Sequence, residues 1–321
     1  MTHNTATKKA ILLMGPTASG KSHLAMALAA HDSRFEIISV DSAQIYKSMN
    51  IGTAKPSAQE QKLVPHHLLD LLDPSQFYSV AQFCEDAFKV MDDIHARGKI
   101  ALCVGGTMLY FKALREGLSD LPETNPTIRQ YWQSQLEQHG IVHLHQQLCQ
   151  RDPIGGLRLK TTDTQRITRA LEIIDSTGRL YSQVLDQPRI TRQDWQFLPL
   201  AIEPENRTAL HDQIKTRFLT MLQLGFLEEV KQLQQRGDLH LDLPAIRTVG
   251  YRQAWLYLSG HIGHSELLEQ AIAATRQLAK RQITWLRSDE NRVVISREII
   301  KNLPKPALET VYQQILDFLH L

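Results

Sequence analysis

The sequence predicts an α/β fold, in which helices flank a parallel β-sheet. Three observations predict it: short apolar runs that are each followed by Gly or Asp, amphipathic stretches between these runs, and proline-punctuated polar helical patterns in the middle of the chain. Strands that alternate with helices form parallel sheets, whose sites lie at the carboxyl ends of the strands. Functional residues are therefore expected immediately after the apolar runs.

The strands are expected at four apolar runs, 10–14, 36–40, 99–104 and 197–202, which read as buried parallel strands. Two helical patterns lie between them. Residues 22–30 place four apolar side chains on one stripe, Leu24, Ala25, Leu28 and Ala29, and a longer amphipathic helix is expected over residues 80–97.

We expect three segments along the chain. Residues 1–118 form the core domain, 119–199 form a helical insertion, and 200–321 return to the core as a largely helical part with breaks at Gly237, Pro244 and Gly260. The insertion is indicated by polar helical patterns between prolines and by little strand signal.

Composition limits the class of protein. The 321 residues are 42% hydrophobic, enough for about two domains with full cores, and the net charge of +2 neither requires nor excludes a polyanionic partner. The three cysteines are odd in number and form no CxxC pair, which argues against a disulfide framework or a zinc knuckle and fits a reducing cytoplasm. No apolar run reaches the roughly 18 residues of a membrane span. A cytoplasmic monomer is expected.

A phosphate-binding loop follows the first expected strand. The segment matches GxxxxGK[ST] between a strand and a helix, and consists of Gly15, Pro16, Thr17, Ala18, Ser19, Gly20, Lys21 and Ser22. Successive backbone N–H groups of such a loop face one anion, and the following helix adds the positive end of its dipole. Lys21 supplies a charge and Ser22 a hydroxyl for Mg²⁺. The motif predicts a P-loop NTPase-like core that binds phosphate, without fixing the reaction.

Asp41 follows the second expected strand and should lie at the same sheet edge as the loop. It could hold Mg²⁺ through water, orient a nucleophile, act as a base, or only form a turn. The third strand leads into Gly105, Gly106 and Thr107 without the carboxylate that many ATPases place there, which argues against a motor or switch.

Basic residues gather in three places. Residues 274–287 hold four cations and no acid; helical spacing puts Ala274, Leu278 and Trp285 on a packed face, with Arg281 close to it, and Arg276, Lys280 and Arg287 on the opposite face. Residues 245–253 interleave Gly, Tyr and Arg, and the insertion holds Arg151, Arg158, Lys160, Arg166, Arg169 and Arg179. RNA binding is one explanation, and a solvated charged surface is the other.

Six blocks in order make the chain resemble the tRNA dimethylallyltransferase family over nearly its whole length: GPTASGKS (15–22), DSAQIYK (41–47), GGTMLY (105–110), DTQRITRALE (163–172), IRTVGYRQ (246–253) and ATRQLAKRQITWLR (274–287). The resemblance implies transfer of a dimethylallyl group from dimethylallyl diphosphate to N6 of the adenosine 3′ of the anticodon, in tRNAs that read codons beginning with U. The product is N6-isopentenyladenosine, diphosphate is released, and Mg²⁺ takes part. The chain lacks the Cys/His zinc finger of many eukaryotic members, so it resembles the bacterial type.

The resemblance also implies roles for individual residues. The phosphate loop would bind diphosphate, Asp41 would take the proton of the adenine N6, and Thr107 and Arg217 would bind the diphosphate as it leaves. Segments that resemble tRNA contacts, some of them shared with catalysis, comprise Asp41, Ser42, Ala43, Gln44, Thr107, Arg129, Gln165, Arg166, Ile167, Thr168, Arg169, Arg247, Thr248, Val249, Gly250, Tyr251, Arg252, Lys280, Arg281 and Arg287.

Physical chemistry supports this assignment separately. An exocyclic adenine amine is a weak nucleophile, and an allylic diphosphate compensates because preorganised donors and Mg²⁺ stabilise its leaving group. The acceptor base must leave its stack, which suits an anticodon loop. The alternatives are a small-molecule kinase that uses ATP, an enzyme that prenylates free adenine nucleotides, and an RNA-stimulated ATPase.

Overall fold

The computed structural model describes residues 7–119, 121 and 125–320, in two compact units. One unit is formed by Met1–Leu114 together with Gln193–Leu321, and the other is Arg115–Arg192. The second unit begins and ends earlier than the expected insertion, 119–199. The difference at the carboxyl end arises because the chain has joined the sheet by Trp195.

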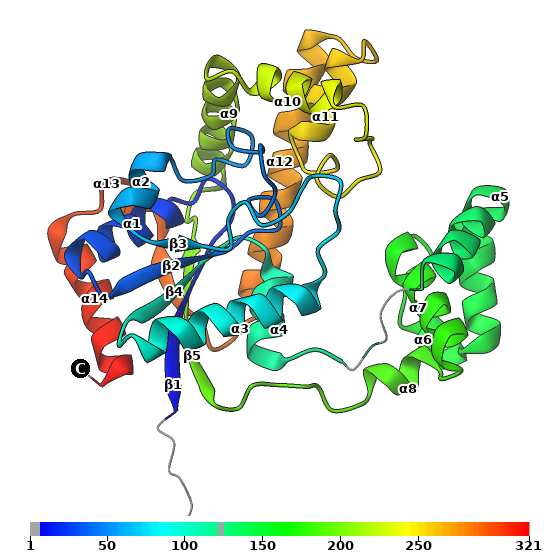
Figure 1. The fold of residues 1–321 in the computed structure, drawn as a ribbon, viewed down its shortest axis with the longest axis horizontal. Coiled ribbons are helices and arrows are strands. Elements are labelled where there is room, and N and C mark those ends of the chain that lie inside the picture. The colour runs from blue at the N-terminus through cyan, green and yellow to red at the C-terminus, as the bar shows by residue number, and fades with distance from the viewer. Residues whose placement is uncertain (1–6, 120, 122–124, 321) are drawn as a thin grey trace, which may run out of the picture. The chain divides into compact units, whose positions relative to one another are not determined.

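The first unit is built on one six-stranded sheet in the order β3-β2-β4-β1-β5-β6 (Figure 1). Every pair of neighbouring strands is parallel, which confirms the predicted fold class. The strands are β1 (Lys8–Met14), β2 (Phe35–Val40), β3 (His66–His67), β4 (Ile100–Gly105), β5 (Trp195–Glu203) and β6 (Val293–Ser296).

The two outermost strands were not predicted. β3 is only two residues long and pairs with β2 at Ile37 and Ile38. β6 lies in a region that was expected to be helical, and it pairs with β5, where Leu200 is opposite Val293. Short strands of this kind carry too few alternations for a periodic signal, so their sheet partners decide the conformation.

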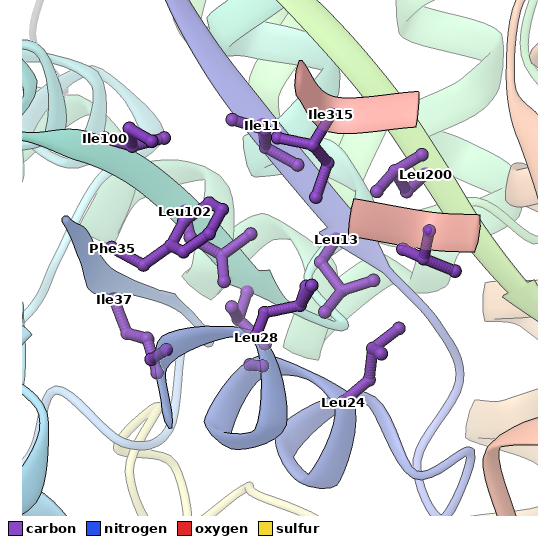
Figure 2. Packing of buried hydrophobic residues seen from close by; sticks show 14 of the residues in the cluster. Ile11, Leu13, Leu24, Leu28, Phe35, Ile37, Ile100, Leu102, Leu200 and Ile315 are labelled. Carbon is purple, nitrogen blue, oxygen red and sulfur yellow. The ribbon is translucent and has the colours of Figure 1, made fainter. Parts of the chain in front are cut away.

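One face of the sheet is covered by three helices, α1 (Lys21–His31), α13 (Arg297–Asn302) and α14 (Lys305–Leu319). Figure 2 shows Leu24 and Leu28 of α1 beside side chains from the strands, with Ile315 of α14 in the same cluster. Fully burying such an aliphatic side chain contributes roughly 1.5–3 kcal/mol. This packing fixes α1, and so the phosphate loop before it, against the sheet.

The other face of the sheet contacts α3 (Val80–Ala96), where Met91 meets Cys103 of β4. The same unit contains two shorter helices, α2 (Ala58–Leu63) and α4 (Met108–Glu116). α3 begins at a capping box in which Ser79 accepts a hydrogen bond from the Gln82 backbone N–H.

A second apolar cluster joins α9 (Arg207–Gln223), α10 (Phe226–Gln235), α11 (Tyr251–Leu258) and α12 (His264–Arg287) to the loop after β2. Buried Glu229 of α10 accepts hydrogen bonds from the backbone N–H groups of Asn50, Ile51 and Gly52 and from the Tyr251 hydroxyl. These bonds hold the loop that begins at Asp41 against the C-terminal helices.

The second unit, Arg115–Arg192, is helical, with α5 (Pro126–Arg151), α6 (Pro153–Leu157), α7 (Thr164–Thr177) and α8 (Tyr181–Leu185). It has its own apolar core, which includes Trp132, Leu148 and Ile167. α5 is interrupted at Gly140, whose φ of 74° lies in the left-handed region that favours glycine.

Within the described residues, no helix is both long enough and apolar enough to cross a membrane.

Candidate active site at the phosphate loop

The phosphate loop connects the carboxyl end of β1 to the amino end of α1, the context that its motif requires. Two of its residues adopt positive φ, Ala18 at 61° and Gly20 at 91°. A Cβ at Gly15 would lie 2.5 Å from the Ser19 hydroxyl oxygen, so a side chain there would force Ser19 to move. The loop therefore curls tightly enough for its N–H groups to surround an anion.

The carboxyl ends of the central strands border a cavity of about 220 Å³. Its polar lining includes Thr17, Lys21 and Ser22 of the loop, with Asp41 after β2 and Arg217 from α9. The structure thus brings together residues that the sequence placed on separate segments. Apolar side chains of Phe218, Met221, Phe226 and Leu278 line the same cavity.

Three charges in this cavity influence one another. The pKa of Lys21 is lowered to about 8, first by burial and then by the nearby Arg217 charge, while Asp41 opposes the shift. Burial also lowers the pKa of Arg217, and Asp41 opposes that effect. Two partly buried cations face one carboxylate, so the site has an excess positive charge that a bound anion would neutralise.

Thr107 joins the turn after β4 to the segment that begins at Asp41. Its hydroxyl oxygen accepts a hydrogen bond from the Ser42 backbone N–H at 3.0 Å, and its own N–H donates to the Val40 carbonyl at 3.2 Å. Asp41 in turn accepts from the Ala43 N–H at 2.9 Å. The orientation of the carboxylate is therefore set by the backbone rather than by a partner side chain.

Apart from Thr107, Ile167 and Tyr251, the residues that resemble tRNA contacts fall into three groups. Some line the cavity with Asp41: Ala43, Gln44, Thr248, Val249 and Gly250. Others are exposed on the same unit: Ser42, Arg247, Arg252, Lys280, Arg281 and Arg287. The rest belong to the second unit, where Arg129, Gln165 and Arg166 are exposed and Thr168 and Arg169 are partly exposed.

Two of these expected contact residues have buried side chains. The side chain of Ile167 is fully buried in the core of the second unit, and Tyr251 is fully buried between α10 and the loop after β2. Neither side chain can reach a nucleic acid in this conformation. A buried aliphatic side chain every third or fourth residue is what an amphipathic helix requires, and that explains Ile167.

The packed face of α12 also differs from the expected one. The helix begins at His264, and within 274–287 it buries Ala279, Gln282, Ile283 and Leu286, whereas Trp285 is 38% exposed. The predicted stripe was wrong because the helix rests on the phosphate loop and α9 on one side, contacts that spacing alone does not reveal.

Three basic residues of α12 differ in exposure and in their partners. Arg276 is not on a solvated face, because its Nε is buried. Arg281, expected beside the packed stripe, is exposed. Arg287 donates a hydrogen bond to Glu203 at 3.1 Å, and this carboxylate also pairs with Arg292.

Several residues at the site were not predicted. Gln282 lies within a quoted sequence block but carries no charge that would mark it. Arg297 donates to the Ala18 carbonyl of the phosphate loop at 3.3 Å, although it lies 279 residues away in sequence. Contacts this distant along the chain leave no local pattern.

Lys21 provides a prediction about pH. Because the pKa of Lys21 is lowered to about 8, the free protein should lose this charge as the pH rises through 8. The affinity for inorganic diphosphate should therefore fall more steeply between pH 7 and pH 9 in the native protein than in a Lys21→Met variant. Calorimetric titrations at a series of pH values measure the affinity of each protein. Protonation of the diphosphate itself affects both proteins equally, so the difference between their pH profiles reports Lys21. Parallel pH profiles would contradict the prediction.

Comparison with known families agrees with this geometry. A sequence model described as IPP transferase matches residues 44–289, and one described as isopentenyl transferase matches residues 8–70. A protein named tRNA dimethylallyltransferase from Janthinobacterium sp. (strain Marseille) is 51% identical over 95% of this chain and 96% of its own length. One with the same name from Ralstonia pickettii (strain 12J) is 52% identical over 89% of this chain and 90% of its own.

Solved structures are similar as well. A tRNA isopentenylpyrophosphate transferase from Staphylococcus epidermidis shares 29% identity at a TM-score of 0.67, over 97% of this chain and 99% of its own. A eukaryotic dimethylallyltransferase acting on tRNA shares 29% identity at a TM-score of 0.74, over 90% of this chain and 74% of its own. The family model covers well over half of the chain, and the relatives match nearly all of it. The chain belongs to the tRNA dimethylallyltransferase family.

Proposed function

We propose that this protein transfers a dimethylallyl group from dimethylallyl diphosphate to tRNA, at N6 of the adenosine 3′ of the anticodon, in tRNAs that read codons beginning with U. The products are N6-isopentenyladenosine and diphosphate. The observation that carries the proposal is the cavity in which Lys21, Arg217 and Asp41 meet beside apolar side chains. A diphosphate ester with a short branched hydrocarbon chain fits this lining, because the diphosphate suits the cations and the hydrocarbon suits the apolar side chains.

The donor is held at its two ends. Backbone N–H groups of the phosphate loop, such as those of Gly20, Lys21 and Ser22, are offered to the diphosphate, with Lys21 and Arg217 as partly buried cations beside it. The dimethylallyl chain lies against Phe218, Met221 and Leu278. In this arrangement a phosphate loop binds a leaving group, and no nucleotide triphosphate is consumed.

The reaction exchanges one bond for another. The bond between the allylic carbon and the diphosphate oxygen breaks, and the oxygen keeps the electron pair. The adenine N6 forms a new bond to that carbon, and its proton passes to the Asp41 carboxylate. Thr107 and Arg217 stabilise the charge that grows on the diphosphate, and such donors matter most where water is excluded.

The residues fit a Mg²⁺ bound together with the substrate. The described part of the chain has no cluster of three or more His, Cys, Asp or Glu side chains for a metal, so most ligands would be diphosphate oxygens and water, as Mg²⁺ prefers in phosphate sites. Ser22 would supply a hydroxyl, and Asp41 lines the same cavity. When bound, the ion would offset part of the charge on the departing diphosphate.

The tRNA is proposed to contact the exposed cations of both units. On the first unit, Lys280 and Arg281 are exposed on α12, whereas Gln282 of the same helix lines the cavity. On the second unit, Arg129 and Arg166 are exposed. We propose that one chain suffices for the reaction, in the cytoplasm where tRNA is found.

Removing these α12 charges should weaken RNA binding in a salt-dependent way. A Lys280→Gln, Arg281→Gln double variant is expected to reduce the slope of log affinity against log salt by roughly one per cation that contacts phosphate. Filter binding of tRNA at several salt concentrations measures the slope. Lys305→Gln at the exposed start of α14 is the matched control. Equal slopes in all three proteins would show that Lys280 and Arg281 are solvated charges that do not contact the RNA phosphates.

A transfer assay tests the proposed function. Radiolabelled dimethylallyl diphosphate is incubated with Mg²⁺ and unmodified tRNA transcripts that carry either adenosine or guanosine next to the anticodon. Label is expected only in the adenosine transcript. Label in both transcripts, or in neither, would contradict the proposed acceptor or the proposed reaction.

A further inference from the structure

We infer that Gln282 is a positioning residue of this site, which holds the phosphate loop and the turn after β4 in fixed register. The residue lies on α12, is 9% exposed, and lines the cavity that contains Asp41 and Lys21. Its Oε1 accepts a hydrogen bond from the Thr17 backbone N–H at 2.9 Å, and its Nε2 donates to the Gly106 carbonyl at 2.9 Å.

One side chain thereby connects the two segments that carry Thr17 and Thr107, both of them proposed to contact the leaving group. A backbone N–H can only donate and a carbonyl can only accept, so one orientation of the Gln282 amide satisfies both partners. Gly106 leaves space for it, since a Cβ at that position would lie 2.5 Å from Gln282 Nε2. The contact therefore requires both the amide and the glycine.

Apolar packing holds the same helix on the loop. Ala279 and Ile283 flank Gln282 along α12, and they belong to a buried cluster that includes Ala18 of the phosphate loop and Ile214 of α9. α9 also carries Arg217. The Gln282 amide therefore lies on a helix that packs against both the phosphate loop and α9, the helix that carries Arg217.

The hydrogen bond also determines which loop donors remain for the anion. Because Thr17 N–H is bonded to Gln282, the anion must be held by other N–H groups of the loop together with Lys21 and Arg217. Loss of the amide would release Thr17 and let the loop and the Thr107 turn move apart. Misplacement of reacting groups by about 1 Å can reduce rates about 10²-fold.

The consequence for catalysis rests on the proposed function, since it is read out as prenyl transfer. A Gln282→Met variant keeps the size of the side chain and removes both hydrogen bonds. We expect its kcat to fall about 10- to 100-fold, with the KM for tRNA within about two-fold of the native value. Gln277→Met, at an exposed position of the same helix, should match the native enzyme.

A Gln282→Glu variant separates positioning from packing. A neutral Glu carboxyl reproduces the pair, with its O–H donating to Gly106 and its carbonyl accepting from Thr17, whereas a carboxylate would repel the Gly106 carbonyl. The ratio of its kcat to the native kcat should therefore rise as the pH falls from 8 to 5.5. The same ratio for Gln282→Met should stay flat. A flat ratio for both variants, or native kcat in both, would overturn the inference.

Binding of inorganic diphosphate distinguishes this inference from the proposed reaction. Calorimetry should show about ten-fold weaker binding by Gln282→Met than by the native protein and by Gln277→Met. Equal affinities in the three proteins would overturn the inference even if the native enzyme prenylates tRNA. If the native protein bound diphosphate about ten-fold more tightly than Gln282→Met but transferred no label, the proposed function would be rejected and the inference would stand.

Discussion

An Asp41→Asn variant is expected to lose about 10²- to 10⁴-fold in kcat, the range typical of a lost general base. The amide keeps the size of the side chain and can still accept from the Ala43 N–H, so the loop should retain its conformation. It cannot take the proton from the adenine N6. Neither dimethylallyl diphosphate nor tRNA should bind much more weakly, because the amide keeps an oxygen acceptor and the change removes a negative charge beside Lys21 and Arg217.

Single-turnover rates and separate binding titrations check this result. Asp242→Asn, at a carboxylate whose side chain is 92% exposed, is the control for an unspecific loss of charge. A single-turnover rate close to native in Asp41→Asn would remove this residue from the proton transfer.

An Arg217→Met variant is expected to lose about 10²- to 10³-fold in kcat, comparable to removal of one preorganised donor at a developing negative charge. Arg217 is partly buried beside Lys21 and Asp41, where a cation acts on the diphosphate more strongly than it would in water. The effect should be larger on kcat than on the affinity for the intact donor, because the charge on the leaving oxygen grows during bond cleavage.

The control for this variant lies on the same helix. Arg207→Met changes an exposed arginine in the first turn of α9 and should behave as the native enzyme. Rapid-quench kinetics give the rate of transfer, and donor binding is measured without tRNA. If Arg217→Met raised the KM for the donor while leaving kcat unchanged, Arg217 would bind substrate and transition state equally, contrary to the leaving-group role.

Much of the architecture was predictable because its signals are local. The strands that end at Met14, Val40 and Gly105 are apolar runs stopped by residues that permit a turn, and the phosphate loop is a contiguous motif. Because carboxyl ends of parallel strands meet at one edge, placing Asp41 and Lys21 in one cavity followed from topology alone.

The remainder depends on contacts between distant parts of the chain. The β-branched residues of β6, Val293 to Ile295, favour a strand, but four residues are too few to show a period, and pairing with β5 decides the conformation. α12 turns Gln282 rather than Trp285 inward because the phosphate loop offers it the Thr17 N–H as a hydrogen-bond donor and packs the small Ala18 side chain against the helix. The ion pair between Arg287 and Glu203 of β5 could not be predicted either, because the two residues lie 84 positions apart.

The central claim is that the phosphate loop binds a leaving diphosphate rather than a nucleotide that is hydrolysed. Its most direct test is the stoichiometry of the products, with labelled tRNA and released diphosphate quantified in the same reaction, with and without ATP. One diphosphate for each prenyl group transferred, at a rate that needs no ATP, is the expected result. Two results together would contradict the claim: release of inorganic phosphate from ATP in proportion to the tRNA added, and no prenyl transfer when ATP is left out.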